Sequence, residues 1–244
     1  MTMNRMSSVG NRSLELRDVG HQFTDHPLFS ELNFPARPGD VTAVVGPSGT
    51  GKSTLLSIMA GWLKPSSGAV VKTSIESTGW VFQNPLGSPL RTACDHVVLP
   101  LLGKGLRRAE AENLALELLE TFNLLHVADR QFRVLSGGEA ARLMLARAAA
   151  LAPDLLMIDE PTAQLDMATA ATVNAVISRI GQSGSIVFVA THDVSTREAC
   201  TRVLDLTKFQ SGRLAGAGHL GGAGKPAKAG SFMRRGKKLR GARP

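Results

Sequence analysis

The sequence predicts an α/β protein built on a doubly wound, mostly parallel sheet. Two observations carry this prediction. Short apolar runs at 41–46, 154–159 and 185–193 alternate with longer stretches of helical periodicity, as buried parallel strands alternate with the helices that cover them. A glycine-rich loop at 46–54 also separates the first run from a helix-forming stretch, which is where such folds bind phosphate groups.

The first elements follow from residue periodicity. Alternating apolar residues in SLELRDV predict a strand near 13–19, and VTAVVG predicts a buried strand at 41–46. A helix is expected from Lys52 through STLLSIMAG, and a strand is expected to end in GWVFQ at 79–83. The chain is therefore expected to begin in the order strand, strand, helix, strand.

A helical stretch from about 92 to 150 interrupts this alternation and predicts an inserted helical subdomain. Within it, RRAEAENLALELLETFNLL is expected to form one amphipathic helix. Apolar residues recur there at spacings of three and four, which predicts a single apolar face; the residues are Ala111, Leu114, Leu118, Phe122 and Leu125.

The remaining elements restore the alternation. DLLMID is expected to form a buried strand at 154–159, MATAATVNAVISRI a helix, and SIVFVATHD a further buried strand.

Charge is distributed unevenly along the chain. The 244 residues carry a formal net charge of +8, and eight Lys and Arg residues lie in 222–244, with no acid after Asp205. Residues 1–221 are therefore formally neutral, which argues against a nucleic-acid-binding body. The Gly- and Ala-rich tail is expected to be disordered; it either contacts anionic lipid or RNA or is a solvated extension.

Composition favours a cytoplasmic protein. Hydrophobic residues make up 43% of the chain, and no apolar run approaches the roughly 18–20 residues that span a bilayer. The N-terminus MTMNRMSSVG lacks the apolar centre of a signal peptide. Cys94 and Cys200 show no pairing or metal-ligand spacing and are interpreted as small buried apolar residues.

GPSGTGKST at 46–54 matches a phosphate-binding P-loop. Its glycines allow backbone N–H groups to curl around phosphate oxygens, and the following helix N-terminus adds favourable partial charge. Lys52 is expected to reach the outer phosphates and Ser53 to ligate Mg²⁺.

Two acids follow the apolar run LLMI, at the carboxyl end of a predicted central strand. Parallel sheets place their ligands at this edge. Asp159 is expected to hold Mg²⁺, through water, and Glu160 to polarise an attacking water. The alternative is a pair of surface acids at a strand end, which the nearby P-loop makes less attractive.

A second candidate anion-binding loop, LSGGE, begins at Leu135 directly before a helix-forming run. With this motif between the P-loop and LLMIDE, the chain resembles the ATPase subunits of ABC transporters over roughly 13–210. In that family two subunits pack head to tail, so that the P-loop of one and the signature loop of the other close on one ATP. The resemblance therefore implies ATP and Mg²⁺ as cofactors, and it explains why one chain carries two such loops.

The resemblance also implies an organisation for the chain. An ATP-binding domain is expected at 13–215, comprising a P-loop NTPase core with a mostly parallel sheet, a small antiparallel β-subdomain and an inserted helical subdomain at about 84–150. The basic tail occupies 216–244.

Individual residues of this chain can be matched to functional residues of the family through their motifs. Gln83 resembles the Q-loop glutamine, His192 the switch histidine, Asp166 the loop aspartate that communicates between sites, and Phe23 the aromatic residue that stacks on adenine. The implied catalytic residues are Glu160, His192, Gln83 and Lys52, and the implied metal ligands are Ser53, Gln83 and Asp159. The implied nucleotide contacts are Phe23, Gly46, Pro47, Ser48, Gly49, Thr50, Gly51, Lys52, Ser53, Thr54, Ser136, Gly137, Gly138 and Asp166.

Some features depart from the family pattern. Ala141 stands where Gln often precedes the signature Arg, and the short segment between Lys52 and Gln83 indicates a trimmed hairpin region. The signature region resembles the lipoprotein-release and macrolide-export branch, whereas the short hairpin region is nearer to importers of sulfonate or nitrate type. No transported substrate follows from these conflicting signals. The other histidines are interpreted as structural or surface residues.

The resemblance implies two partners: an integral-membrane permease, and a second ATPase subunit that is identical or paralogous. The chain would then lie peripherally on the inner face of the cell membrane. One alternative is a soluble, non-transport ABC ATPase that serves nucleic acid, the ribosome or cofactor assembly. A nucleotide switch without turnover is a second alternative, and the presence of Glu160 and His192 argues against it.

Overall fold

The computed structural model describes residues 11–24, 26–163 and 165–210. The expected tail at 216–244 lies outside the described residues, as do its basic side chains.

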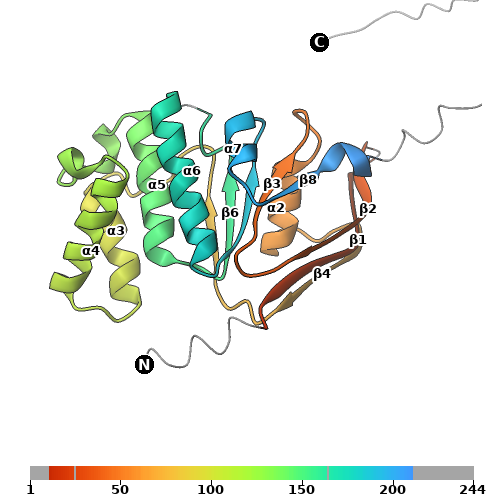
Figure 1. Cartoon of the computed structure of the whole chain (residues 1–244), viewed down its shortest axis with the longest axis horizontal. Helices are drawn as coiled ribbons and strands as arrows, with labels where there is room; N and C mark the ends of the chain where they lie inside the picture. The colour runs from red at the N-terminus through yellow and green to blue at the C-terminus, as the bar shows by residue number, and fades with distance from the viewer. Residues whose placement is uncertain (1–10, 25, 164, 211–244) are drawn as a thin grey trace, which may run out of the picture. The chain divides into compact units, whose positions relative to one another are not determined.

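A five-stranded parallel sheet forms the centre of the described chain. Its strand order is β5 (Thr78–Val81), β6 (Leu155–Asp159), β7 (Ile186–Ala190), β3 (Val41–Val45) and β8 (Arg202–Asp205). The helices α5 (Gly137–Leu151) and α6 (Met167–Gln182) lie side by side on one face, and α2 (Lys52–Ala60) lies on the other (Figure 1). This arrangement confirms the predicted α/β fold class.

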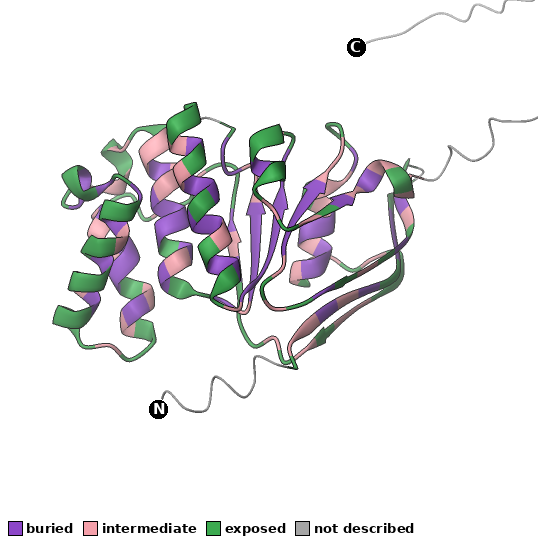
Figure 2. Ribbon diagram, viewed as in Figure 1, coloured by how far each residue is buried: buried purple, intermediate pink, exposed green. Residues whose placement is uncertain are grey.

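The apolar run of β6 is continuous because both faces of the sheet are covered. Leu156 and Ile158 belong to the core cluster that includes α5 and α6. Leu155 and Met157 point to the opposite face, where their cluster includes α2 and the second sheet. The central strands are accordingly buried along their length (Figure 2).

The second sheet is antiparallel and three-stranded, in the order β2 (His26–Ala36), β1 (Ser13–Phe23) and β4 (Ser67–Thr73). It confirms the expected small antiparallel subdomain. Strands β1 and β2 form a hairpin in which Phe23 pairs with His26. Phe23 therefore stands at the turn end of the hairpin.

The helical region contains α3 (Ala93–Gly103), α4 (Arg108–Thr121), two short 3₁₀ turns, η1 (Leu125–Val127) and η2 (Phe132–Val134), and the first turns of α5. The helix predicted through Leu125 ends at Thr121, so Leu125 lies in η1. The predicted apolar face is wrong at Leu114, which is 40% exposed, and at Leu125, which is 47% exposed. The buried side is formed by Ala111, Ala115 and Leu119. Small alanines allow α4 to approach its neighbours closely, and this rotates the buried side away from Leu114.

Two predicted strands are shorter than expected. Strand β5 ends at Val81, so Gln83 lies in the following loop, and β7 ends at Ala190, so His192 lies in the loop before α7 (Val194–Glu198). Side chains on these loops are released from the sheet and are free to face a ligand. The described chain ends with the 3₁₀ turn η3 (Leu206–Phe209). No helix in the described part of the chain combines the length and the apolar character that a bilayer crossing needs.

Candidate functional site

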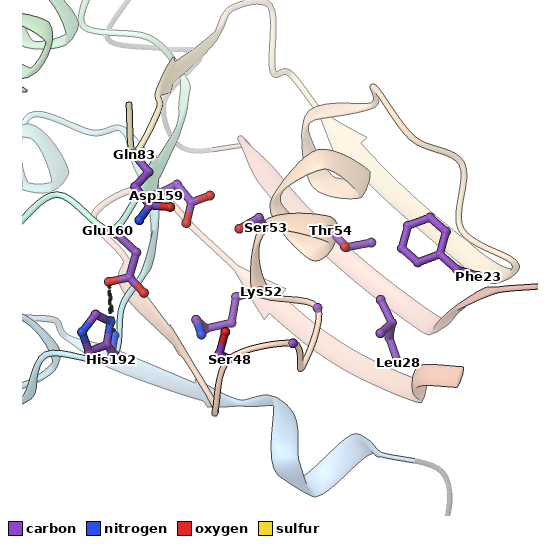
Figure 3. Close-up of a pocket in the computed structure, with 12 residues that line it drawn as sticks. Phe23, Leu28, Ser48, Lys52, Ser53, Thr54, Gln83, Asp159, Glu160 and His192 are labelled. Carbon is purple, nitrogen blue, oxygen red and sulfur yellow. Dashed lines mark hydrogen bonds and ion pairs between the residues drawn. The ribbon is translucent and has the colours of Figure 1, made fainter. Parts of the chain in front are cut away.

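A pocket of about 670 Å³ opens at the carboxyl ends of the parallel strands (Figure 3). Its size is in the range of pockets that bind small molecules and cofactors. It is lined by Phe23, Leu28, Ser48, Gly49, Gly51, Lys52, Ser53, Thr54, Gln83, Asp159, Glu160 and His192. Segments far apart in the sequence thus converge where the sequence predicted a site.

The glycine-rich loop adopts a backbone that favours glycine. Gly49 and Gly51 have φ values of +82° and +93°, which lie in the left-handed region. A Cβ on Gly51 would also lie 3.0 Å from Leu28 Cδ1. The loop is closed from within, because buried Thr50 donates its hydroxyl hydrogen to the Pro47 carbonyl oxygen at 2.9 Å. Thr50 therefore shapes the loop and does not line the pocket.

Positive charge gathers at the start of α2. Its N-terminus has no side-chain cap, so its first N–H groups are available to an anion. Lys52 donates from Nζ to the carbonyl oxygens of Gly46 at 2.9 Å and Pro47 at 3.3 Å. The ammonium group is thereby held beside the loop, at the place where a phosphate group would approach.

Asp159 and Ser53 are oxygen-bearing residues of the pocket lining, and Ser53 lies between Asp159 and Phe23 in the view of Figure 3. Burial raises the pKa of the Asp159 carboxyl, while the neighbouring Ser53 hydroxyl and the Lys52 charge act to lower it. A desolvated carboxylate beside a hydroxyl oxygen suits a hard cation such as Mg²⁺. The amide group of Gln83 is a third oxygen donor at the same pocket.

Glu160 and His192 form a contacting pair at the ends of two adjacent strands. His192 Nδ1 lies 2.9 Å from Glu160 Oε2, as the dashed line in Figure 3 marks. Glu160 also adopts a φ of +49°, which is uncommon for a residue with a side chain. Its backbone N–H donates to the Ala190 carbonyl oxygen at 2.9 Å, and this bond ties the strained residue to β7. Such strain is typical of functional positions.

Phe23 presents an open ring face at the outer end of the pocket. The ring is 50% exposed, and its edge-on contact with His21, at 4.7 Å between ring centroids, fixes its orientation. Leu28 lies beside it in the pocket lining. The sequence analysis missed Leu28, because only the pairing of β1 with β2 brings it beside Phe23.

The second anion-binding loop does not line this pocket. Ser136, Gly137 and Gly138 are absent from the lining, as is Asp166. Ser136 caps α5, and Asp166 caps α6 through the Thr169 N–H at 3.0 Å. The two candidate phosphate-binding loops therefore remain separate within the described part of one chain.

A left-handed glycine loop, a lysine, an uncapped helix and two acids at strand ends define a P-loop nucleotide-binding protein. Comparison with known proteins refines that class. The family model described as ABC transporter matches residues 29–163. The chain belongs to the ABC transporter family, and it is an ATP-binding ATPase subunit of that kind.

Two curated relatives illustrate the similarity. The chain is 36% identical over 199 residues to the lipoprotein-releasing system ATP-binding protein LolD of Koribacter versatilis, covering 75% of this chain and 89% of LolD. It is 37% identical over 184 residues to the molybdenum import ATP-binding protein ModC of Mycobacterium tuberculosis, covering 67% of this chain. The chain spans only 50% of ModC.

A solved structure shows the same fold. It is the dimeric post-hydrolysis state of the ATP-binding cassette MJ0796 bound to ADP and Pi. The TM-score is 0.70 and the sequence identity 28%, with coverage of 81% of this chain and 94% of that chain.

Proposed function

We propose that this subunit binds MgATP in the described pocket and hydrolyses it at a site completed by the signature loop of a second ATPase subunit. The observation that carries this proposal is the separation of the loops. The pocket gathers the P-loop and both strand-end acids, whereas the Ser136 loop lies outside its lining. A second subunit packed head to tail would supply Ser136, Gly137, Gly138 and Asp166. The ATP-binding domain is proposed to occupy 13–215, with its helical subdomain at about 84–150.

Ser53, Asp159 and Gln83 are the proposed Mg²⁺ ligands. Asp159 and Ser53 both line the pocket beside Lys52, so their oxygens face the same space. When bound, the ion would neutralise charge on the transferring phosphoryl group. Lys52 and the N–H groups that open α2 would stabilise the same charge from the protein side.

Glu160 is the proposed general base, and His192 its orienting partner. The contact at 2.9 Å holds Glu160 Oε2, and the carboxyl side chain, which is only 10% exposed, is shielded from bulk water. A shielded carboxylate at the edge of the phosphate pocket is suited to accepting a proton from an attacking water. Phe23 would stack on adenine with its exposed ring face.

An exposed aromatic surface supports a permease partner. Trp62, Trp80 and Phe82 stack in sequence, with centroids 4.5 Å apart for the two tryptophans and 5.4 Å apart for Trp80 and Phe82. Trp62 is 62% exposed. This aromatic stack continues directly into Gln83 through Phe82. A permease segment docked there, at the inner face of the membrane, would be coupled to the nucleotide pocket.

The basic tail is proposed to contact anionic lipid, on the strength of its eight basic residues. Deleting 222–244 should leave ATPase activity intact and reduce sedimentation with anionic liposomes at low salt. Sedimentation that survives both the deletion and added salt would contradict this role.

Complementation in a mixed dimer tests the composite site. Lys52→Ala disables the P-loop and Ser136→Arg blocks the signature loop, so each variant alone should be inactive. A mixture contains one composite site in which both loops are intact, and it should recover part of the ATPase activity.

If the mixture shows no ATPase activity, cross-linking tests directly whether the two subunits pack head to tail. Ser48→Cys and Gly137→Cys, placed on separate chains that lack Cys94 and Cys200, should cross-link in the presence of ATP. Absence of both rescue and cross-link would overturn the head-to-tail site for two copies of this chain.

A further inference from the structure

The signature serine, Ser136, is hydrogen-bonded to a carboxylate from the helix that it caps. Ser136 donates its hydroxyl hydrogen to Glu139 Oε2 at 2.8 Å, and its backbone N–H donates to the same oxygen at 2.7 Å. The Glu139 N–H in turn donates to Ser136 Oγ at 3.3 Å. Both Ser136 donors are therefore satisfied by Glu139.

This pairing leaves no hydrogen on Ser136 for a phosphate. A serine hydroxyl has a single hydrogen to donate, and Glu139 receives it. The proposed function requires Ser136 to donate to the ATP held by the opposite subunit. The Glu139 carboxylate and a phosphate oxygen are thus rivals for the same hydrogen.

The carboxylate is held in place and remains charged. His126 Nε2 lies 3.4 Å from Glu139 Oε1, so the second oxygen has its own partner and Oε2 is turned toward Ser136. The hydrogen bonds from the Ser136 N–H and hydroxyl lower the pKa of the Glu139 carboxyl. Its negative charge therefore lies at the helix N-terminus that an approaching phosphate would use.

We propose that Glu139 is a positioning residue that restrains the signature loop, because it holds the Ser136 hydroxyl hydrogen and repels ATP until the dimer closes. The proposal rests on the function proposed above. Closure around ATP would turn the Ser136 hydroxyl from Glu139 to phosphate. The positive charge of Arg142, whose Nη1 lies 3.6 Å from the position of a Cβ on Gly138, favours the phosphate side of this exchange.

Glu139→Gln tests the proposal in the full-length chain. Glutamine keeps the length of the side chain and an oxygen for the Ser136 N–H, but it removes the charge and weakens the hold on the hydroxyl. The KM for ATP should fall by roughly two- to tenfold, as expected for a partly exposed charge effect, and the kcat should change less. Added salt should shrink the difference between variant and wild type.

Glu110→Gln is the matched control. Glu110 occupies the same capping position on α4, where it accepts the Arg107 N–H at 3.2 Å. It does not line the nucleotide pocket. Its substitution should leave the KM for ATP unchanged, which separates the effect of the signature loop from a general effect of helix-cap charge.

Different outcomes would overturn the restraint by Glu139 and the composite ATP site on which it rests. An unchanged or higher KM in a folded Glu139→Gln protein would overturn the restraint, leaving Glu139 as a helix cap. If the glutamine variant does not fold, Glu139→Ala must lower the KM in its place, since it also lacks the charge. Ser136→Ala with normal ATPase activity would instead overturn the role of Ser136 in the proposed function.

Discussion

His192 Nδ1 lies 2.9 Å from Glu160 Oε2, and the His192 backbone N–H donates to the same oxygen at 3.4 Å. The two residues follow neighbouring parallel strands, β7 and β6, which pair along their whole length. One carboxylate oxygen is thereby fixed from the adjacent strand end, and the other oxygen remains directed to the pocket that contains Lys52 and Ser53. This arrangement suits the role of general base that is proposed for Glu160.

Glu160→Gln should lower ATP turnover by at least about 100-fold, because the amide does not accept the proton of an attacking water. ATP binding should persist, since the P-loop and Asp159 are untouched. Phosphate-release assays and nucleotide-binding titrations measure the two effects separately, and size-exclusion chromatography should reveal an ATP-bound dimer. Near-normal phosphate release would remove Glu160 from its proposed role.

Phe23→Ala should weaken ATP binding by roughly 1–3 kcal/mol, the range for loss of a base–aromatic stacking contact. The maximal rate should change less, because Phe23 lies at the end of the pocket away from Glu160. GTP should be tolerated, since stacking does not read base edges. Equilibrium titration measures the affinities, and unchanged ATP affinity would place the adenine elsewhere. Phe23→Trp, which keeps a ring face, is the control.

Asp159→Asn should make the fold more stable and abolish Mg²⁺-dependent ATPase activity. Burial raises the pKa of the Asp159 carboxyl, so the native state holds this proton more tightly than the unfolded chain does. The contribution of Asp159 to stability therefore decreases as the pH rises from the ordinary carboxyl pKa through the raised value, and it stays low above that window.

At neutral pH the asparagine variant should accordingly be more stable than wild type and unfold at a higher temperature, while Mg²⁺-dependent ATPase activity is lost. The stability difference should diminish in acid, where the wild-type carboxyl is protonated. Thermal melts of nucleotide-free protein across this pH range provide the measurement. A variant less stable than wild type at pH 7 would contradict the prediction.

Trp62→Ala should impair association with the permease without changing basal ATPase activity, because Trp62 lies in the exposed aromatic stack and not in the nucleotide pocket. Loss of a central aromatic anchor typically costs about 2 kcal/mol or more in binding. Co-purification of a multi-span membrane protein from detergent-solubilised native membranes measures the effect. Leu125→Ala, at a comparably exposed apolar residue, should behave as wild type; equal losses in both variants would refute a specific role for the stack.

Five of the eight strands, the phosphate loop and the two acids that follow LLMI could be predicted from the sequence, whereas β2, β4 and β8 could not. The predicted features depend on residues that are close together in the sequence. Buried parallel strands appear as short apolar runs, and a left-handed loop before a helix requires glycines such as Gly49 and Gly51. Most residues that line the pocket lie in or just after these segments, although β5 and β7 end before Gln83 and His192.

Helix packing selected which side of α4 is buried, because the sequence contains competing apolar stripes and close approach favours the one with alanines. The tertiary structure also decided that Leu28 faces the pocket, that His126 contacts Glu139, and that Ser136 lies outside the pocket of its own chain. These relationships join residues that are distant in sequence. Their geometry depends on how helices and sheets pack, and residue spacing along one element carries no record of that packing.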